Sequence, residues 1–231
     1  MKIIGWNCNM AFRKKAEQIL KFKPDILVVS ECEKINEQTS KHLWFGDNQN
    51  KGIGIFSYSN YDFELHEMYN DSFKYVIPIK VKGLLNFNLF AVWTKKVDNP
   101  KEEYIGQLKL ALDYYATLLD EPSIIIGDFN MDKNIEIKYG YQDPARITTV
   151  CGFLNKKKIR STYHIHYNEK LGSETRPTLF QWKKLEKPFH NDYCFASDLF
   201  IKRLNHVTIG EFNDWKEYSD HMPVIVTFND G

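Results

Sequence analysis

Cysteine is scarce in this sequence, and the positions of the few that occur exclude a zinc site and a disulfide framework as the means of stabilising the fold. Only four are present among 231 residues. They form no C-x-x-C pair and no spacing typical of a zinc site, and they are too scattered to indicate the disulfide framework of a secreted domain. We predict reduced thiols in a cytosolic protein at Cys8, Cys32, Cys151 and Cys194.

Long hydrophobic runs are also missing. No apolar segment approaches the roughly 20 residues that a transmembrane helix requires. The apolar run in the N-terminal segment MKIIGWNCNM is too short for the core of a secretory signal peptide. We therefore expect a cytoplasmic protein without a membrane partner.

Charge of one sign is not in excess. The formal net charge at pH 7 is +1, so no overall electrostatic field draws the chain to nucleic acid. A surface that binds phosphate must therefore be local.

Repeats, low-complexity tracts and Gly/Ser linkers do not occur, so the sequence offers no domain boundary. The hydrophobic fraction is 43% and the charged fraction 26%, as in an ordinary soluble globular protein. We expect a single domain over residues 1–231.

Short strand-like runs alternate with helical patterns along the chain. Apolar residues at helical spacing predict one helix over residues 12–20 and another that ends near Leu119. The second would be capped by Asn99, with Pro100 at its first position. A third helix would open at 143–144 and run toward Leu154. Strands are expected at 2–7, 26–30, 52–57, 75–81, 86–93, 124–127, 178–182, 192–196 and 224–228. This mixture predicts a layered α/β or α+β protein built on sheets.

Polar side chains stand at the ends of five of these strands. Each one alone is most simply a turn former. Together they supply four carboxylates, two carboxamides and one imidazole. If the strand ends converge, these groups provide hard oxygen ligands for Mg²⁺ or Mn²⁺, a base and a group that stabilises negative charge. The residues are Asn7, Glu31, Asp128, Asn130, Asp192, Asp220 and His221.

Five short motifs in this order resemble those of the endonuclease/exonuclease/phosphatase superfamily. They are WN at 6–7, SECE around Glu31, GDFN at 127–130, NDY at 191–193 and SDH at 219–221. GDFN followed about ninety residues later by SDH is a specific signal, whereas either motif alone would be weak. The resemblance spans nearly the whole chain. It implies a four-layered α/β sandwich, in which two mixed β-sheets pack face to face with helices outside.

The resemblance also implies hydrolysis of phosphate esters with a divalent metal. By matching position, Glu31 would be the principal ligand of Mg²⁺ or Mn²⁺. Asn7 and Asp220 would complete or support that metal site.

The matching positions imply catalytic roles for four further residues. Asp128 would orient or deprotonate the attacking water, and Asn130 would hold the phosphate or that water. His221 would stabilise charge that develops on the phosphoryl oxygens. Asp192 would accept a hydrogen bond from His221, which fixes its tautomer and favours the imidazolium.

Four residues are candidate contacts to the substrate, and two of them depart from the family pattern. Asn9 stands where nucleases of the family often have an aspartate, and Trp93 stands where the family usually has Tyr or His. The neighbouring Lys95 offers a phosphate contact beside Trp93. His164 lies in a long polar segment and, with His166 two residues later, could share one face of a strand.

Three local basic groups are further candidates for holding a polyanion. They lie at 13–15, 95–96 and 156–160. A lysine-rich chain carries many such groups as solvated surface. The first two follow Asn7 and Trp93 directly, which places them near the rim of the predicted site.

The expected function is metal-dependent hydrolysis of phosphodiester bonds in DNA, by an endonuclease or an exonuclease. One alternative is a phosphatase or phosphodiesterase that acts on a small-molecule or lipid phosphate ester. The chain has little room for an added lipid-binding domain, which favours the nuclease. A non-catalytic binding module is the other alternative, and the complete set of polar residues argues against it.

Overall fold

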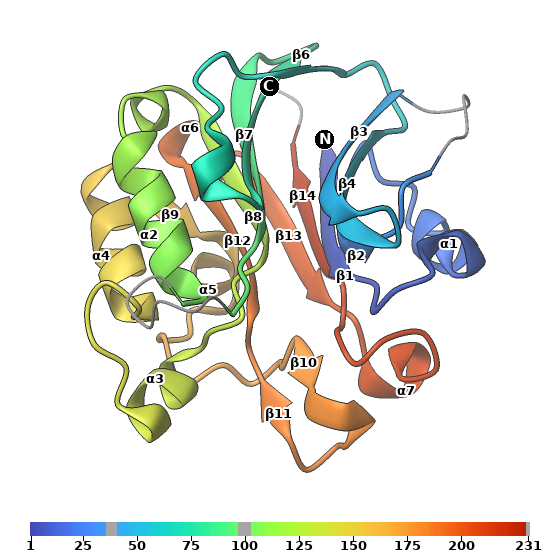
Figure 1. Cartoon of the computed structure of the whole chain (residues 1–231), viewed down its shortest axis with the longest axis vertical. Coiled ribbons are helices and arrows are strands. Elements are labelled where there is room, and N and C mark those ends of the chain that lie inside the picture. Colours follow the sequence, from blue (N-terminus) through green and yellow to red (C-terminus); the bar gives the residue numbers. More distant parts are fainter. Residues whose placement is uncertain (36–40, 97–102, 230–231) are drawn as a thin grey trace.

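Two six-stranded β-sheets form the framework of the computed structural model, which describes residues 1–35, 41–96 and 103–229 (Figure 1). The first sheet has the strand order β13-β14-β1-β2-β4-β3. Its strands are β1 (Lys2–Asn7), β2 (Ile26–Cys32), β3 (Lys41–Asn48), β4 (Lys51–Ser57), β13 (Leu204–Ile209) and β14 (Val224–Phe228).

The second sheet has the strand order β5-β6-β7-β8-β12-β9. Its strands are β5 (Asp62–Leu65), β6 (Val76–Lys82), β7 (Phe87–Trp93), β8 (Ser123–Asp128), β9 (Ile159–Ser161) and β12 (Asp192–Ser197). A separate two-stranded hairpin pairs β10 (Leu179–Phe180) with β11 (Pro188–Phe189).

Both sheets are mixed, and their pairing brings distant polar residues to one edge. In the first sheet β1 is parallel to β2 and antiparallel to β14. In the second sheet β8 is parallel to β7 and antiparallel to β12. The carboxyl ends of β1, β2 and β8 carry Asn7, Glu31 and Asp128, and the antiparallel β12 begins at the same edge with Asp192.

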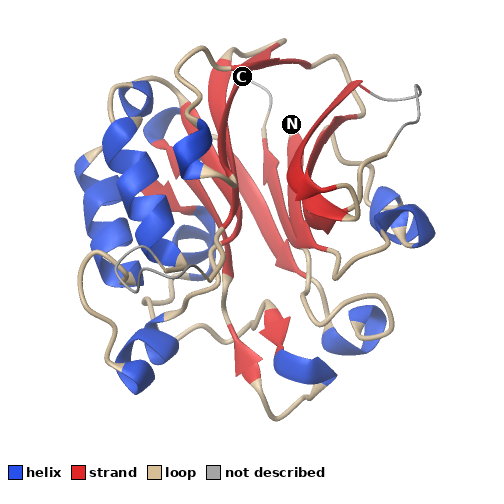
Figure 2. Ribbon diagram, in the orientation of Figure 1, coloured by secondary structure: helices blue, strands red, loops and turns tan. Residues whose placement is uncertain are grey.

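Helices cover the outer faces of the two sheets, so that the molecule has four layers (Figure 2). Helices α2 and α4 lie on the outer face of the second sheet, whereas α1 and α7 lie beyond the first. The α-helices are α1 (Ala16–Leu20), α2 (Ile105–Tyr114), α3 (Lys133–Tyr139), α4 (Ile147–Lys156), α5 (Thr162–Tyr167), α6 (Asp198–Ile201) and α7 (Phe212–Trp215). The 3₁₀ helices are η1 (Phe12–Lys14), η2 (Asp71–Phe73), η3 (Leu118–Asp120) and η4 (Gln181–Lys183). The four-layered α/β sandwich predicted from the sequence is confirmed.

The hydrophobic core explains the near-continuous apolar runs of the central strands. Strands that are buried on both faces lack the alternation of a half-exposed strand, and all six residues of β8 are buried. One core cluster fills the space between the sheets, and a second joins α2 and α4 to the outer face of the second sheet. Leu108 and Leu112 of α2 are fully buried there, as the apolar stripe predicted. Each such side chain contributes about 1.5–3 kcal/mol of burial free energy.

Several predicted elements differ in detail from the structure. Residues 12–20 form two short pieces, η1 and α1, separated by Lys15, whose φ of −124° is not helical. The strand predicted over 178–182 stops at Phe180, because the chain turns into η4 with Trp182 at φ 59°. Helix α4 begins at Ile147, after the predicted opening. The predicted cap Asn99 and Pro100 lie outside the described residues.

The prediction that His164 and His166 share the face of a strand is wrong. Both lie in α5, a six-residue helix. Ser161 caps it, since its hydroxyl accepts a hydrogen bond from the backbone N–H of His164 at 3.4 Å. A serine before the first helical residue is a known N-terminal signal, and it outweighs the polar alternation of the segment.

All four cysteines carry free thiols. Among the described residues, none of the helices combines the length and the apolar character that a membrane span requires.

Candidate active site

Asn7 joins two carboxylates that come from different sheets. Its side-chain amide donates to Asp128 Oδ2 at 2.9 Å and lies 3.4 Å from Glu31 Oε1. Asn7 is the last residue of β1 and is 2% exposed. The hydroxyl of Ser219 donates to its backbone carbonyl at 2.8 Å. The predicted convergence of the strand ends is therefore present for this group.

A local irregularity in β2 sets the position of Glu31. The register between β2 and β4 shifts between Ser30 and Cys32, and Glu31 has a φ of 58°. Such a bulge re-aims one side chain while the flanking pairs stay in the sheet, at a cost of order 1–3 kcal/mol for the unfavourable backbone conformation. The Glu31 carboxylate also forms an ion pair with Lys51, whose Nζ lies 3.0 Å from Oε2.

The GDFN segment is a tight turn that aims Asp128 and Asn130 at the same point. Gly127 has a φ of 144°, and a Cβ at this position would lie 1.9 Å from the carbonyl oxygen of Val92. The backbone N–H of Asn130 donates to Asp128 Oδ1 at 2.9 Å, and its side-chain amide donates to Oδ2 at 3.0 Å. The same amide donates to the Thr94 carbonyl at 2.8 Å. Both oxygens of Asp128 therefore accept hydrogen bonds.

His221 lies between two aspartates. Its Nδ1 is 2.9 Å from Asp192 Oδ2, and its Nε2 is 4.0 Å from Asp128 Oδ2. Two hydroxyls support this pair: Thr178 Oγ1 accepts from the backbone N–H of Asp192 at 2.9 Å, and Ser219 Oγ accepts from that of His221 at 3.0 Å. The predicted pairing of His221 with Asp192 is present, and its imidazole also faces Asp128.

Burial makes the protonation states of this cluster unusual. Desolvation, with a further contribution from the nearby Asp192, raises the pKa of Asp128 to about 7. Burial opposes the charge on His221, but Asp192 and Asp128 outweigh it and raise the pKa of His221 to about 10. His221 is therefore an imidazolium at neutral pH, and Asp128 has a pKa suited to accepting a proton there.

The donor set suits a hard divalent cation. One potential ligand atom from each of Asp128, Asp192 and His221 lies within 4.8 Å of the others, a spacing that could hold a metal ion. Asn7 links Glu31 to the same group. Carboxylate and carboxamide oxygens are the ligands that Mg²⁺ prefers, and a cation would offset the desolvation that raises the pKa of Asp128.

Asp220 reaches the site through its backbone and its charge. Its carbonyl accepts from the backbone N–H of Phe180 at 2.8 Å. Its half-buried carboxylate adds to the rise in the pKa of His221 that the other two aspartates cause, and it opposes the lowering of the pKa of Lys15 that burial causes. Among the described residues of the site, none forms a hydrogen bond with its carboxylate, so its role at the metal stays a prediction.

Three of the predicted substrate contacts lie at this edge. Asn9 is exposed, and its backbone N–H donates to Asn7 Oδ1 at 3.0 Å. Trp93 is only 3% exposed, and it packs edge-on against Tyr75 at 5.0 Å between ring centres. Lys95 places its ammonium 3.7 Å from the centre of the Tyr75 ring and 4.7 Å from that of Trp93.

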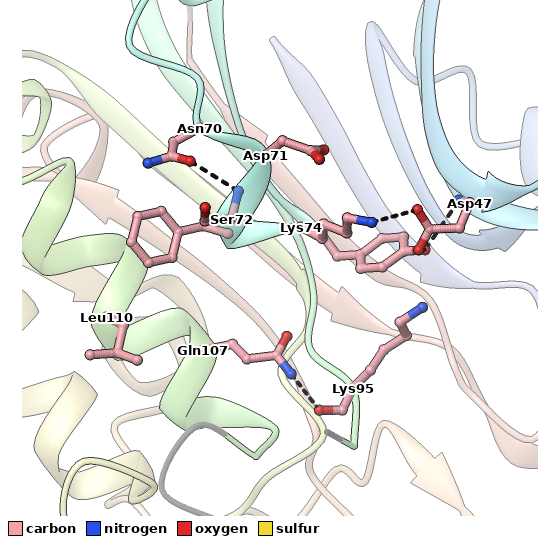
Figure 3. Close-up of a pocket in the computed structure, with 10 residues that line it drawn as sticks. Asp47, Asn70, Asp71, Ser72, Lys74, Lys95, Gln107 and Leu110 are labelled. Atoms are coloured by element: carbon pink, nitrogen blue, oxygen red, sulfur yellow. Dashed lines mark hydrogen bonds and ion pairs between the residues drawn. The ribbon is translucent and has the colours of Figure 1, made fainter. Parts of the chain in front are cut away.

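Lys95 also lines the pocket shown in Figure 3, which has a volume of about 540 Å³. Gln107 donates to its backbone carbonyl at 2.7 Å, and Lys74 pairs with Asp47. The lining therefore combines charges of both signs with the apolar side chains of Phe73 and Leu110.

His164 lies elsewhere, in the wall of a different pocket of about 380 Å³. Its two ring nitrogens face Ser161 Oγ at 2.7 Å and Glu174 Oε1 at 2.9 Å. Its predicted contact with substrate remains a prediction.

The predicted basic groups also differ in whether their side chains are paired within the chain or lie at the site. Arg13 pairs with Glu33, and Arg160 pairs with Asp198, so both are held by carboxylates of the chain. Lys15 donates to the backbone carbonyls of Cys8 and Asn9 and lies at the rim beside Asp220.

Two supporting residues were not predicted from the sequence. Lys51 begins β4, and Thr178 precedes β10. Thr178 is a hydrogen-bonding residue of ordinary loop composition, and nothing in the sequence distinguishes it. Lys51 stands directly before the strand predicted at 52–57, but only strand pairing brings it to Glu31.

No family model and no curated protein matches this sequence, whereas solved structures match it over its full length. The 3′ phosphatase NExo from Neisseria, bound to a product DNA hairpin, is 19% identical with a TM-score of 0.69, and 100% of each chain is covered. An AP endonuclease from Archaeoglobus fulgidus is 17% identical with a TM-score of 0.71, again with 100% of each chain covered. The AP endonuclease LMAP from Leishmania major is 11% identical with a TM-score of 0.75, covering 100% of this chain and 88% of that one.

The chain therefore shares its fold, two stacked mixed β-sheets with helices outside, with these solved structures.

Proposed function

We propose that this protein is a divalent-metal-dependent phosphodiesterase that cleaves DNA. One observation carries the proposal: Asp128 is bridged to the Glu31 carboxylate by Asn7 and also faces the imidazolium of His221, which Asp192 holds. A base, a cation site and a positively charged hydrogen-bond donor are the three groups that hydrolysis at phosphorus needs.

Asp128 is the group that accepts the proton of the attacking water. Its pKa of about 7 places its charge change near neutral pH, where a general base is most effective. Asn130, whose amide is fixed by Thr94 and Asp128, orients that water or a phosphoryl oxygen.

His221 stabilises the negative charge that grows on the phosphoryl oxygens. Its Nδ1–H donates to Asp192, which leaves the protonated Nε2 directed toward Asp128 and the reacting centre. A preorganised charged donor of this kind acts without the reorganisation that water would need.

Glu31, with Asn7 and Asp220, would hold Mg²⁺ or Mn²⁺. Such an ion supplies positive charge at the phosphoryl oxygens and makes water a stronger nucleophile. The triad of Asp128, Asp192 and His221 also has a spacing that could hold an ion. We assign the cation to the Glu31 side, because an imidazolium has no free lone pair to donate.

Two observations support DNA as the substrate. The structural neighbours include a 3′ phosphatase bound to a DNA hairpin and AP endonucleases. The hairpin of β10 and β11 stands at the catalytic edge, where Leu179 bridges to His221. It carries Trp182, which is 66% exposed with the Lys187 ammonium 3.8 Å from its ring centre. An exposed indole beside an ammonium suits stacking on a base and contact with a phosphate.

The test is an activity panel with and without Mg²⁺. It contains plasmid, single-stranded and abasic-site DNA, DNA ending in a 3′-phosphate, RNA, inositol phosphates and a generic phosphodiester. We expect hydrolysis of at least one DNA substrate that EDTA abolishes and His221→Ala removes. His206→Ala, which changes an exposed histidine of β13, is the matched control and should keep full activity. Hydrolysis of the small or lipid esters alone would replace DNA as the substrate, and no hydrolysis of any ester would favour a binding module.

A further inference from the structure

The Glu31 carboxylate already holds a cation that belongs to the chain. Lys51 Nζ lies 3.0 Å from Oε2, while the other oxygen, Oε1, lies 3.4 Å from the Asn7 amide. Each carboxylate oxygen therefore faces a donor. The carboxylate that is proposed to bind the metal is the same one that is paired with an ammonium.

The pairing of β2 with β4 holds Glu31 and Lys51 next to each other. Glu31 sits in the bulge of β2, and Cys32 beside it pairs with Gly52, the residue after Lys51 in β4. The side chain of Glu31 is 19% exposed, and that of Lys51 is 40% exposed. The pair is thus set at the entrance of the site, where solvent ions can reach it.

The ammonium of Lys51 has a second partner in Trp93. It lies 5.3 Å from the centre of the indole ring, on the residue that pairs with Asp128 across β7 and β8. An ammonium over an indole is stabilised by the negative face of the ring. The Trp93 ring can therefore stabilise the Lys51 ammonium when that ammonium does not contact Glu31.

A divalent cation on the same carboxylate would face strong repulsion from this ammonium. Like charges a few ångströms apart, one of them double, repel strongly in a partly buried site. Both ions also compete for the lone pairs of one carboxylate. The metal and the ammonium are thus alternatives at Glu31.

We propose that Lys51 is a positioning residue that occupies Glu31 in the metal-free protein and is displaced by the divalent cation. This inference rests on the proposed function, since it places the metal at Glu31. The exchange keeps the carboxylate in place before the metal arrives and lowers the apparent affinity for the metal. It also favours ions whose charge is high enough to displace an ammonium.

The test measures Mg²⁺ binding by titration calorimetry to wild-type protein and to single variants. Lys51→Met removes the competing charge with a side chain of similar length. Lys95→Met is the matched control, because it removes an ammonium from the same indole but not from a carboxylate of the site. The titrations are run in raised KCl, which screens long-range repulsion more than a contact pair.

Lys51→Met is expected to bind Mg²⁺ about 3- to 10-fold more tightly than Lys95→Met, the scale of a partly exposed ion pair. Lys51→Arg keeps the pair and should bind no more tightly than wild type. Thermal unfolding gives a second readout: without metal Lys51→Met melts below wild type, and Mg²⁺ raises its melting temperature by more. Lys51→Gln repeats the test if Lys51→Met does not fold.

Equal or weaker binding by Lys51→Met, relative to Lys95→Met, would overturn the exchange. If Mg²⁺-dependent DNA hydrolysis persists in that case, the proposed function stands while the role of Lys51 falls. If Glu31→Gln binds Mg²⁺ as wild type does, the metal is not at Glu31, and both the exchange and the proposed cation site are wrong.

Discussion

Asp128 and Asp192 lie directly opposite each other in the antiparallel pairing of β8 with β12. Two carboxylates at such a position repel and destabilise a sheet, and both of these are buried. The structure offsets this cost with hydrogen bonds from Asn7 and Asn130 to Asp128 and with an imidazolium next to both acids. Polar groups with strongly shifted pKa values cluster at functional sites. The opposed aspartates are therefore better explained by catalysis than by stability of the sheet.

The pairing of His221 with Asp192 gives the sharpest test of catalysis. Asp192→Asn keeps the shape of the side chain but removes the charge that holds the imidazolium. We expect kcat to fall on the order of 10²-fold or more, with the fold and metal binding near wild type. If Asp192 only forms a turn, the change will instead lower stability with little loss of activity.

The same variant should move the alkaline limb of the activity profile. Wild-type activity is expected to decline as pH rises through about 10, the pKa to which the two aspartates raise His221. Without Asp192 the imidazolium loses its proton at lower pH. Steady-state rates across the alkaline range measure this shift, and the double variant with His221→Ala should be far from additive. An unchanged alkaline limb would remove His221 from the mechanism.

Stability should depend on pH through the same histidine. The pKa of His221 rises on folding from 6.5 to about 10, so its contribution to stability is fully present below pH 6.5 and is lost as pH rises through about 10. The unfolding free energy of wild type, relative to His221→Gln, should therefore fall across that interval. Denaturant titrations at fixed pH values measure it, and a difference that does not change with pH would contradict the raised pKa.

Metal binding should depend on the charge of Glu31. Glu31→Gln removes one negative charge from a site for a hard cation and should weaken Mg²⁺ binding by at least about 10-fold. Glu17→Gln, an exposed glutamate of α1, is the control and should bind as wild type does. Calorimetry measures both, and hydrolysis by wild type that resists EDTA would show that no metal takes part.

The turn at Gly127 should tolerate no side chain. Gly127→Ala would place its Cβ 1.9 Å from the Val92 carbonyl at a φ of 144°, and we expect a loss of about 3 kcal/mol or more in unfolding free energy. Gly140→Ala is the control. Gly140 has a φ of 65°, but a Cβ there would have no atom within 4 Å, so this change should lower the unfolding free energy by only about 1–2 kcal/mol. Denaturant unfolding compares the two, and equal losses would mean that the close approach to Val92 is not what requires glycine.

The positions of the central strands and the identity of the polar residues at their ends follow from the sequence alone. Val28, Ile125 and their neighbours lie in short apolar runs that are typical of a strand buried on both faces. The residues that end these runs, such as Asn7 and Asp128, have little use in a core. Their order along the chain gives the resemblance to the endonuclease/exonuclease/phosphatase superfamily, and that resemblance implied the four-layered sandwich.

Only the tertiary structure decided which of these residues meet and with which partners. The sequence places Asn7 and Asp128 more than a hundred residues apart, and the packing of one sheet on the other brings them to 2.9 Å. Lys51 reaches Glu31 because β4 pairs with β2 across a bulge, and no spacing in the sequence encodes that register. The short helix of His164 and the burial of Trp93 depend likewise on local capping and on core packing. Strand patterns are local properties of the chain, whereas contacts at a strand edge depend on pairing between segments far apart in sequence.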